Sequence, residues 1–131
     1  MTLPAALSSS EKHPGATDDE LADLEGDLGT SLPEDYRRIL RESNGAEGFF
    51  GNERYLVLWR TSDIASLNAS YSVQEFLPGV ILFGTDGSDT GYGFTRSAGV
   101  QYVSVPLVGM APEEMLLLGS SFSDFLHHLS I

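Results

Sequence analysis

The sequence predicts an α+β fold in which a largely antiparallel sheet is flanked by two N-terminal helices and one C-terminal helix. Residues 17–44 contain two helical patterns, residues 46–119 contain short strand-like runs separated by glycine-rich turns, and residues 121–129 return to a helical pattern. Consecutive strand-like runs favour antiparallel pairing, because a parallel neighbour needs a long crossover connection.

The first predicted helix begins at Thr17 and ends at Gly29. Thr17 and Glu20 have the spacing of a capping box, in which the two side chains satisfy the free amides of the first turn. Glycine after the last turn suits a helix C-terminus. One apolar stripe, formed at i, i+3 and i+7, is expected to face the core: Leu21, Leu24 and Leu28.

A second helix is predicted from Leu32-Pro33 to Asn44-Gly45. Proline is tolerated in the first turn of a helix, where its missing amide costs no hydrogen bond. The helical spacing gives this segment a buried face made of Tyr36, Ile39 and Leu40.

The middle of the chain is predicted to form the sheet. A short helix from Ser62 through Leu67 and a polar glycine loop at Thr85–Gly91 interrupt the strands. A loop or single helical turn at Ala111–Glu114 leads to an apolar run at Met115–Leu118, which we expect to be buried. The predicted strands are Phe49–Phe50, Tyr55–Trp59, Val80–Phe83, Tyr92–Thr95 and Val100–Val105.

The last predicted helix begins after Ser121, which has capping spacing to Asp124. Its apolar residues recur at i, i+3, i+4 and i+7, the pattern of a helix with one buried face: Phe122, Phe125, Leu126 and Leu129.

The length of 131 residues indicates one domain, which we place at residues 17–131 after a flexible lead-in at residues 1–16.

The absence of cysteine excludes disulfides, thiolate catalysis and cysteine zinc sites. No apolar run approaches 18 residues, and the N-terminus is a poor secretory signal. We therefore expect a cytoplasmic monomer that does not contact membranes.

The acidic composition argues against nucleic-acid binding. The formal net charge is -12, with 19 acidic and 7 basic residues. Phosphate backbones are bound by basic surfaces and would be repelled here. The partner is therefore expected to be a protein.

An ordered set of motifs resembles the SUKH superfamily, which includes fungal cell-wall synthesis regulators and bacterial immunity proteins. The most specific part runs from Leu32-Pro33-Glu34-Asp35-Tyr36 to Asn44-Gly45, and a Gly84-Thr85-Asp86-Gly87 segment follows. The resemblance covers about residues 17–130. The residues that carry it are Leu32, Pro33, Tyr36, Asn44, Gly45, Gly84, Asp86 and Gly87.

The resemblance implies an α+β fold without catalytic activity. For a small bacterial member it implies an immunity protein that binds and neutralises a toxin, many of which are nucleases. The alternative that the fungal members suggest is a scaffold or regulatory protein-binding module.

Three aspartates on the first helix are the main candidates for partner contact. Asp19, Asp23 and Asp27 recur every four residues, away from the leucine stripe. Like charges at i and i+4 each cost about 0.2–0.5 kcal/mol in an isolated helix. Solubility is one explanation of the row, and a basic protein partner, such as a toxin that acts on nucleic acid, is the other.

The Thr85–Gly91 loop supplies two further candidates, Asp86 and Asp89. The spacing fits neither a calcium loop nor a phosphate cradle. The favoured interpretation is a tight turn in which Asp86 accepts hydrogen bonds from nearby backbone amides. The alternative is an interface role for both aspartates.

Nothing in the sequence selects an enzyme, a metal or a cofactor. His127 and His128 are helix neighbours, which point about 100° apart and do not converge on one ion. His13 lies in the lead-in without an obvious partner. No serine lies in a Gly-x-Ser-x-Gly elbow, so a hydrolase would rest only on the many carboxylates.

Overall fold

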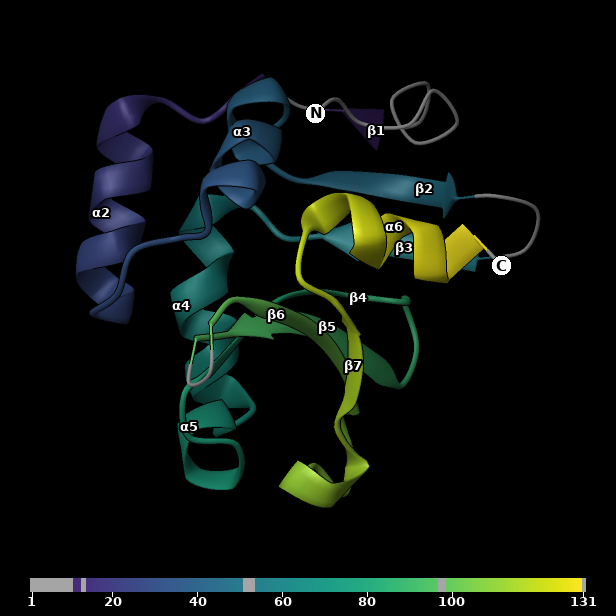
Figure 1. The fold of residues 1–131 in the computed structure, drawn as a ribbon. Helices are drawn as coiled ribbons and strands as arrows, with labels where there is room; N and C mark the ends of the chain where they lie inside the picture. The colour runs from purple at the N-terminus through teal and green to yellow at the C-terminus, as the bar shows by residue number, and fades with distance from the viewer. Residues whose placement is uncertain (1–10, 13, 51–53, 97–98, 131) are drawn as a thin grey trace.

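The structure, a computed structural model, describes residues 11–12, 14–50, 54–96 and 99–130. This described part contains five α-helices and one seven-stranded antiparallel sheet whose strands follow chain order (Figure 1), which confirms the predicted α+β class. The helices are α2 (Asp18–Leu28), α3 (Glu34–Glu42), α4 (Thr61–Ser70), α5 (Val73–Phe76) and α6 (Phe122–Ser130). The strands are β1 (Glu11–Lys12), β2 (Ala46–Phe50), β3 (Arg54–Leu58), β4 (Val80–Thr85), β5 (Thr90–Thr95), β6 (Gln101–Pro106) and β7 (Leu116–Gly119).

The predicted helix ends are formed by local side-chain and backbone contacts. Thr17 and Glu20 make both hydrogen bonds of the capping box on α2, and Gly29 closes the helix in the left-handed region at φ 73°. Helix α6 is capped by Ser121, whose hydroxyl accepts a hydrogen bond from the Asp124 amide at 3.1 Å. These caps satisfy amides and carbonyls that a helix cannot pair internally.

Several boundaries differ from the prediction because contacts along the chain extend them. Helix α4 continues to Ser70, three residues beyond Leu67, and the short helix α5 follows it. The predicted loop at Thr85–Gly91 shrinks to residues 86–89, because β4 extends to Thr85, β5 begins at Thr90, and Thr85 pairs with Gly91.

The expectation that Met115–Leu118 is buried is wrong for Leu116 and Leu117, whereas Met115 and Leu118 are half-buried against the core. Strand β7 lies at the end of the sheet, and within the described part of the chain it pairs only with β6. Leu116 and Leu117 are 64% and 62% exposed. An apolar run is compatible with either a buried or an edge position, and here only one side of the strand has a neighbour.

The predicted lead-in falls largely on residues outside the described ones, as does His13. Of its described part, Glu11–Lys12 pairs with β2. The Asn44 amide donates to the Pro14 carbonyl at 3.0 Å, and the Ala16 amide donates to the Leu40 carbonyl at 2.8 Å. Residues 14–16 thus lie against α3, and Ala16 is buried.

The core centres on aromatic rings from α3, the sheet and α6. Tyr36 stacks on Phe83 with ring centroids 4.7 Å apart, and Phe83 meets Phe125 edge-on at 5.5 Å. Tyr102 meets Phe122 edge-on at 5.7 Å. Aromatic pairs in these geometries each contribute about 0.5–1.5 kcal/mol beyond the burial of their area.

The Asp35 carboxylate connects the three elements that surround this core. One oxygen accepts a hydrogen bond from the Tyr102 hydroxyl of β6 at 2.6 Å, and the other accepts one from the Phe122 amide of α6 at 2.6 Å. The Phe122 amide belongs to the first turn of α6, where amides lack helical partners. Burial, reinforced by the Asp35 carboxylate, raises the pKa of Tyr102 above its usual value of 10.0, so its hydroxyl stays a donor.

Two asparagines join helices to the rest of the fold in the same way. Asn44, from the family motif, accepts a hydrogen bond from the Thr61 amide at 2.8 Å and so fixes the start of α4. Asn68 exchanges two hydrogen bonds of 2.8 Å with the backbone of Leu82, which fixes α4 against β4.

The motif glycines are explained by backbone geometry. A Cβ on Gly84 would lie 2.3 Å from the Val57 carbonyl oxygen, so only glycine lets β3 and β4 approach. Gly45 adopts φ 88°, a region that favours glycine. The residues that carry the family resemblance therefore build the fold.

Replacing Asp35 by asparagine should lower the free energy of unfolding by about 2–3 kcal/mol. The asparagine side chain has one oxygen in place of two, so it cannot accept from the Tyr102 hydroxyl and the Phe122 amide as the carboxylate does. A buried polar group is then left unpaired. Urea denaturation measures this loss. Glu34→Gln is the matched control, since Glu34 shares the first turn of α3 and is exposed; its effect should stay below about 0.5 kcal/mol. Equal losses in the two variants would contradict the role of Asp35.

Tyr36→Phe should leave the free energy of unfolding unchanged or raise it. The Tyr36 hydroxyl is buried and has no hydrogen-bond partner among the described residues, so its removal takes away a desolvation cost of about 1–3 kcal/mol. Tyr36→Ala should lower stability by about 3–5 kcal/mol, because it opens a cavity between Phe83 and Phe122. A loss above about 1 kcal/mol in the phenylalanine variant would show that the hydroxyl is stabilising.

Candidate functional site

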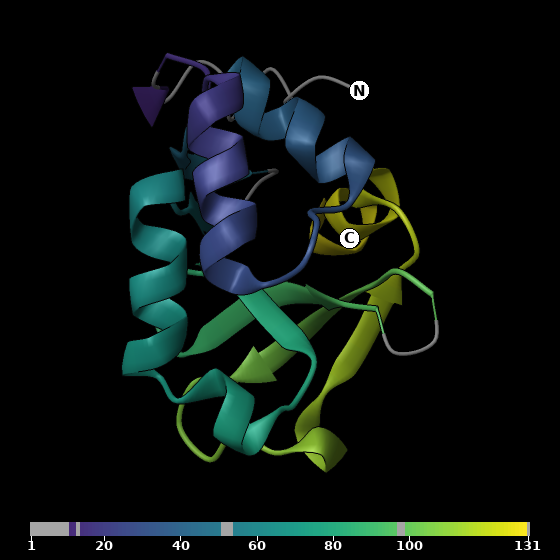
Figure 2. The same ribbon diagram turned by 90° about the vertical axis from the view of Figure 1, so that its left-hand side faces the viewer.

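Helix α2 presents its predicted aspartate row to solvent. Leu21 and Leu24 are buried, whereas Asp19, Asp23 and Asp27 are all exposed. Figure 2 shows α2 at the front of the molecule, side by side with α4. At 1.5 Å per residue the three aspartates extend about 12 Å along the helix.

The other acidic side chains of α2 have structural partners. Asp18 pairs with Arg41 at 3.1 Å, and Glu20 completes the capping box. Glu25 accepts a hydrogen bond from the Leu32 amide at 2.7 Å. By contrast, no described residue forms an ion pair with Asp19, Asp23 or Asp27. Only Asp19, in the first turn, gains from the helix dipole.

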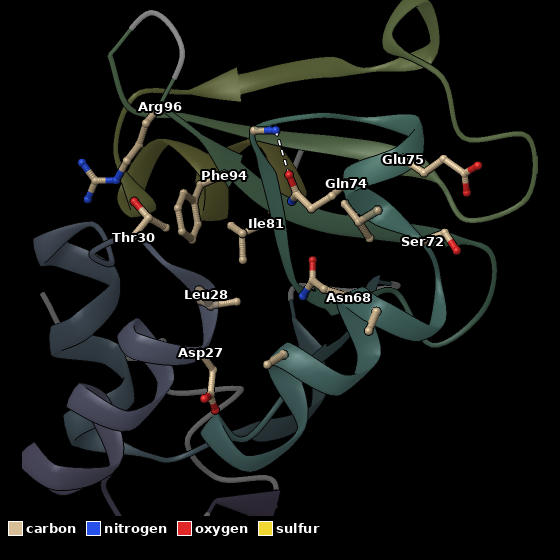
Figure 3. A pocket seen from close by; sticks show the side chains of 14 residues that line it. Asp27, Leu28, Thr30, Asn68, Ser72, Gln74, Glu75, Ile81, Phe94 and Arg96 are labelled. Carbon is tan, nitrogen blue, oxygen red and sulfur yellow. Dashed lines mark hydrogen bonds between the residues drawn. The ribbon is translucent and has the colours of Figure 1, made fainter.

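A cleft of about 710 Å³ lies beside the end of this row, between α2, the α4–α5 corner and the β4–β5 hairpin. Figure 3 shows Leu28, Ile81 and Phe94 converging on the hollow. Asp27 and Arg96 stand on opposite sides of the opening. The cleft is therefore an apolar hollow with charged groups at its rim.

Two polar side chains that line the cleft, Asn68 and Gln74, are hydrogen-bonded to the backbone. Asn68 is bonded to Ile64 and Leu82 as described, at 2.7–2.8 Å. The Gln74 amide donates to the Val80 carbonyl at 2.6 Å and accepts from the Gly79 amide at 3.1 Å. The surface left to a ligand is consequently mostly apolar, which suits a hydrophobic side chain of a partner better than a polar metabolite.

The loop candidates Asp86 and Asp89 lie apart from the aspartate row. Figure 1 shows the connection between β4 and β5 on the opposite side of the molecule from α2. One oxygen of Asp86 accepts from the Ser88 and Thr90 amides at 2.9 and 3.1 Å, which confirms the tight-turn interpretation. Asp89 is exposed. One flat interface would not cover both groups.

The described residues do not assemble a metal site. Within them, no three histidine or acidic side chains lie close enough together to hold an ion. The rings of His127 and His128 are 6.4 Å apart with an interplanar angle of 81°, and both are exposed. Burial raises the pKa of Tyr36, Tyr92 and Tyr102, none of which lines the cleft.

These observations define an α+β domain with an acidic helix face beside an apolar cleft. The chain belongs to the SMI1 / KNR4 family (SUKH-1), whose family model matches residues 15–128, and this confirms the resemblance inferred from the motifs. No curated protein matches the chain. Among the described residues, no helix is both long and apolar enough to span a membrane.

Sequence reasoning located the aspartate row but missed the cleft. Its lining comes from α2, α4, α5 and the β4–β5 hairpin, and no periodic pattern links these segments. It also missed the tertiary role of Asp35, although the motif Leu32-Pro33-Glu34-Asp35-Tyr36 was a signal that this position is specialised.

Asp23→Asn should stabilise the fold by about 0.4–1 kcal/mol at low salt, because it removes repulsion from both Asp19 and Asp27. The gain should shrink at an ionic strength of about 0.5 M, where exposed charges are screened. Thermal or urea denaturation at the two salt concentrations measures both effects. Asp89→Asn makes the same change in net charge outside the row and should leave stability nearly unchanged. A loss of stability in Asp23→Asn would show that the aspartate serves the fold.

Proposed function

We propose that this chain is a cytoplasmic immunity protein that acts as a monomer and without catalysis. It binds a cognate bacterial toxin and neutralises it by occlusion. The observation that carries the proposal is the exposed aspartate row of α2, which has no ion-pair partner among the described residues and is unfavourable for the helix itself. Membership of the SUKH-1 family supports it.

The charge of the row determines the kind of toxin that fits. A nuclease presents a basic surface to its phosphate substrate, and three aligned carboxylates match such a surface. Complementary charge accelerates encounter and selects among partners. Occupation of the basic surface by α2 would exclude the nucleic acid from the toxin.

The adjacent cleft adds the apolar contact that a stable interface needs. Binding energy in protein interfaces is concentrated in a few buried anchor side chains surrounded by a polar rim. Leu28, Ile81 and Phe94 provide a place for such an anchor, and Asp27 belongs to both the cleft and the row. We therefore assign one continuous interface to the outer face of α2 and the cleft.

Co-expression with the product of the neighbouring reading frame is the direct test of the function. The chain should protect cells from that product and should co-purify with it. Protection without co-purification, or a lack of protection, would contradict neutralisation by binding. A partner other than a toxin would favour the regulatory protein-binding module.

The combined variant Asp23→Asn, Asp27→Asn should slow association with the toxin by about 3–10-fold at low salt and should weaken its salt dependence. Asp19 is left unchanged because it also stabilises the start of the helix. Stopped-flow or surface-binding kinetics measure both quantities.

The matched control is Asp89→Asn with Asp124→Asn, which removes the same charge from exposed positions outside α2. Its association rate should stay close to that of the parent. If both double variants slowed association equally, the position of the aspartates on α2 would not matter. The interface would then lie elsewhere, or the association rate would depend only on the net charge of the chain.

A further inference from the structure

Strand β7 is an edge strand with an open outer side. It is the last strand in the order of the sheet and pairs with β6 alone among the described residues. An open edge offers unpaired backbone donors and acceptors to another extended chain. Leu116 and Leu117 are exposed, contrary to the prediction, because they lie on this edge strand.

The four-residue strand β7 is short, but its apolar run lacks two of the features that protect an edge. Natural edge strands carry lysine, proline or inward charges that prevent pairing with other chains. The run Met115–Leu118 contains no charge and no proline. Leu116 and Leu117 are 64% and 62% exposed, and because neighbours in a strand point to opposite faces, each face presents one exposed leucine, whereas Met115 and Leu118 pack against the core.

The surroundings of β7 are acidic. Glu113 and Glu114 form the exposed 3-10 turn η1 (Pro112–Glu114) directly before the strand. The sequence from residue 61 to the end contains one basic residue, Arg96. A segment that pairs with this edge is therefore favoured if it carries positive charge near η1. A second copy of the chain would bring two charges of -12 together, which makes it the poorer occupant.

The direction of β7 specifies where that positive charge must lie. Every described pair of neighbouring strands in the sheet is antiparallel, and antiparallel pairing is the more stable arrangement. The strand runs away from Glu113 and Glu114, so an antiparallel partner ends beside them. Its basic residues would follow its apolar run.

We propose that β7 is a docking edge for an extended segment of a partner protein, which adds to the sheet as an antiparallel strand. The segment has apolar residues at alternate positions, followed by lysine or arginine residues that meet Glu113 and Glu114. This surface is separate from the interface at α2, since Figure 1 shows β7 and α2 on different sides of the molecule. The proposal for β7 does not depend on whether the partner that binds at α2 is a toxin.

The test uses three synthetic peptides with the full chain. The first, VTVTVTKK, has its lysines after the alternating run; KKVTVTVT has them before it; VTVTVTEE replaces them by glutamate. Amide hydrogen exchange, followed by NMR, reports pairing at those amides of Leu116, Leu117 and Leu118 that point away from β6, since successive amides of a strand point to opposite edges. We expect VTVTVTKK to slow exchange at these amides by about fivefold or more, and the other two peptides to slow it less.

Two variants assign the effect to the proposed contacts. Glu113→Gln with Glu114→Gln should abolish the preference among the three peptides. Leu117→Lys should abolish protection by VTVTVTKK, and it should leave the fold intact because Leu117 is exposed.

Absence of protection, or equal protection by all three peptides, would overturn the proposal. So would protection of β7 in the chain alone that increases with its own concentration, since this would make a second copy the occupant. Sedimentation velocity over the same concentrations identifies that case.

Discussion

The Asp35 carboxylate is the contact on which the arrangement of this fold depends. It lies at the start of α3 and accepts hydrogen bonds from Tyr102 on β6 and from Phe122 at the start of α6. Those three segments are far apart in the chain, and the aromatic rings of the core lie between them. One short side chain therefore sets the distance at which α3, the sheet and α6 close over the core. Asn44 and Asn68 fix α4 to the same framework.

Because these contacts lie inside the fold, the outer surfaces of the molecule remain available for binding. The motif residues of the family are used for turns, caps and close backbone contacts, so they do not specify a partner. The aspartate row of α2 and the cleft beside it contribute little to these contacts.

Local sequence patterns were enough to predict most elements. The caps at Thr17 and Ser121 and the apolar spacing of the helices act within a few residues, so they can be recognised without the fold. The aspartate row was predictable for the same reason, because its spacing and its distance from the leucine stripe are local. The aromatic residues on the predicted buried faces, Tyr36, Phe122 and Phe125, also lie in the core.

The failures concern properties that depend on the position of an element in the sheet. The leucines of β7 have the composition of a buried strand, and only the strand order shows that they lie at an edge. The cleft and the separation of Asp86 from α2 likewise depend on tertiary arrangement. The same holds for Asp35, whose partners are 67 and 87 residues away.

We propose that the outer face of α2 and the adjoining cleft form the contact surface for a basic toxin. Hydrogen exchange of the chain with and without its toxin partner tests this proposal most directly. We expect amides of α2, α5 and the start of β4 to exchange more slowly in the complex. A complex in which these amides exchange as in the free chain, with protection confined to other surfaces, would contradict it.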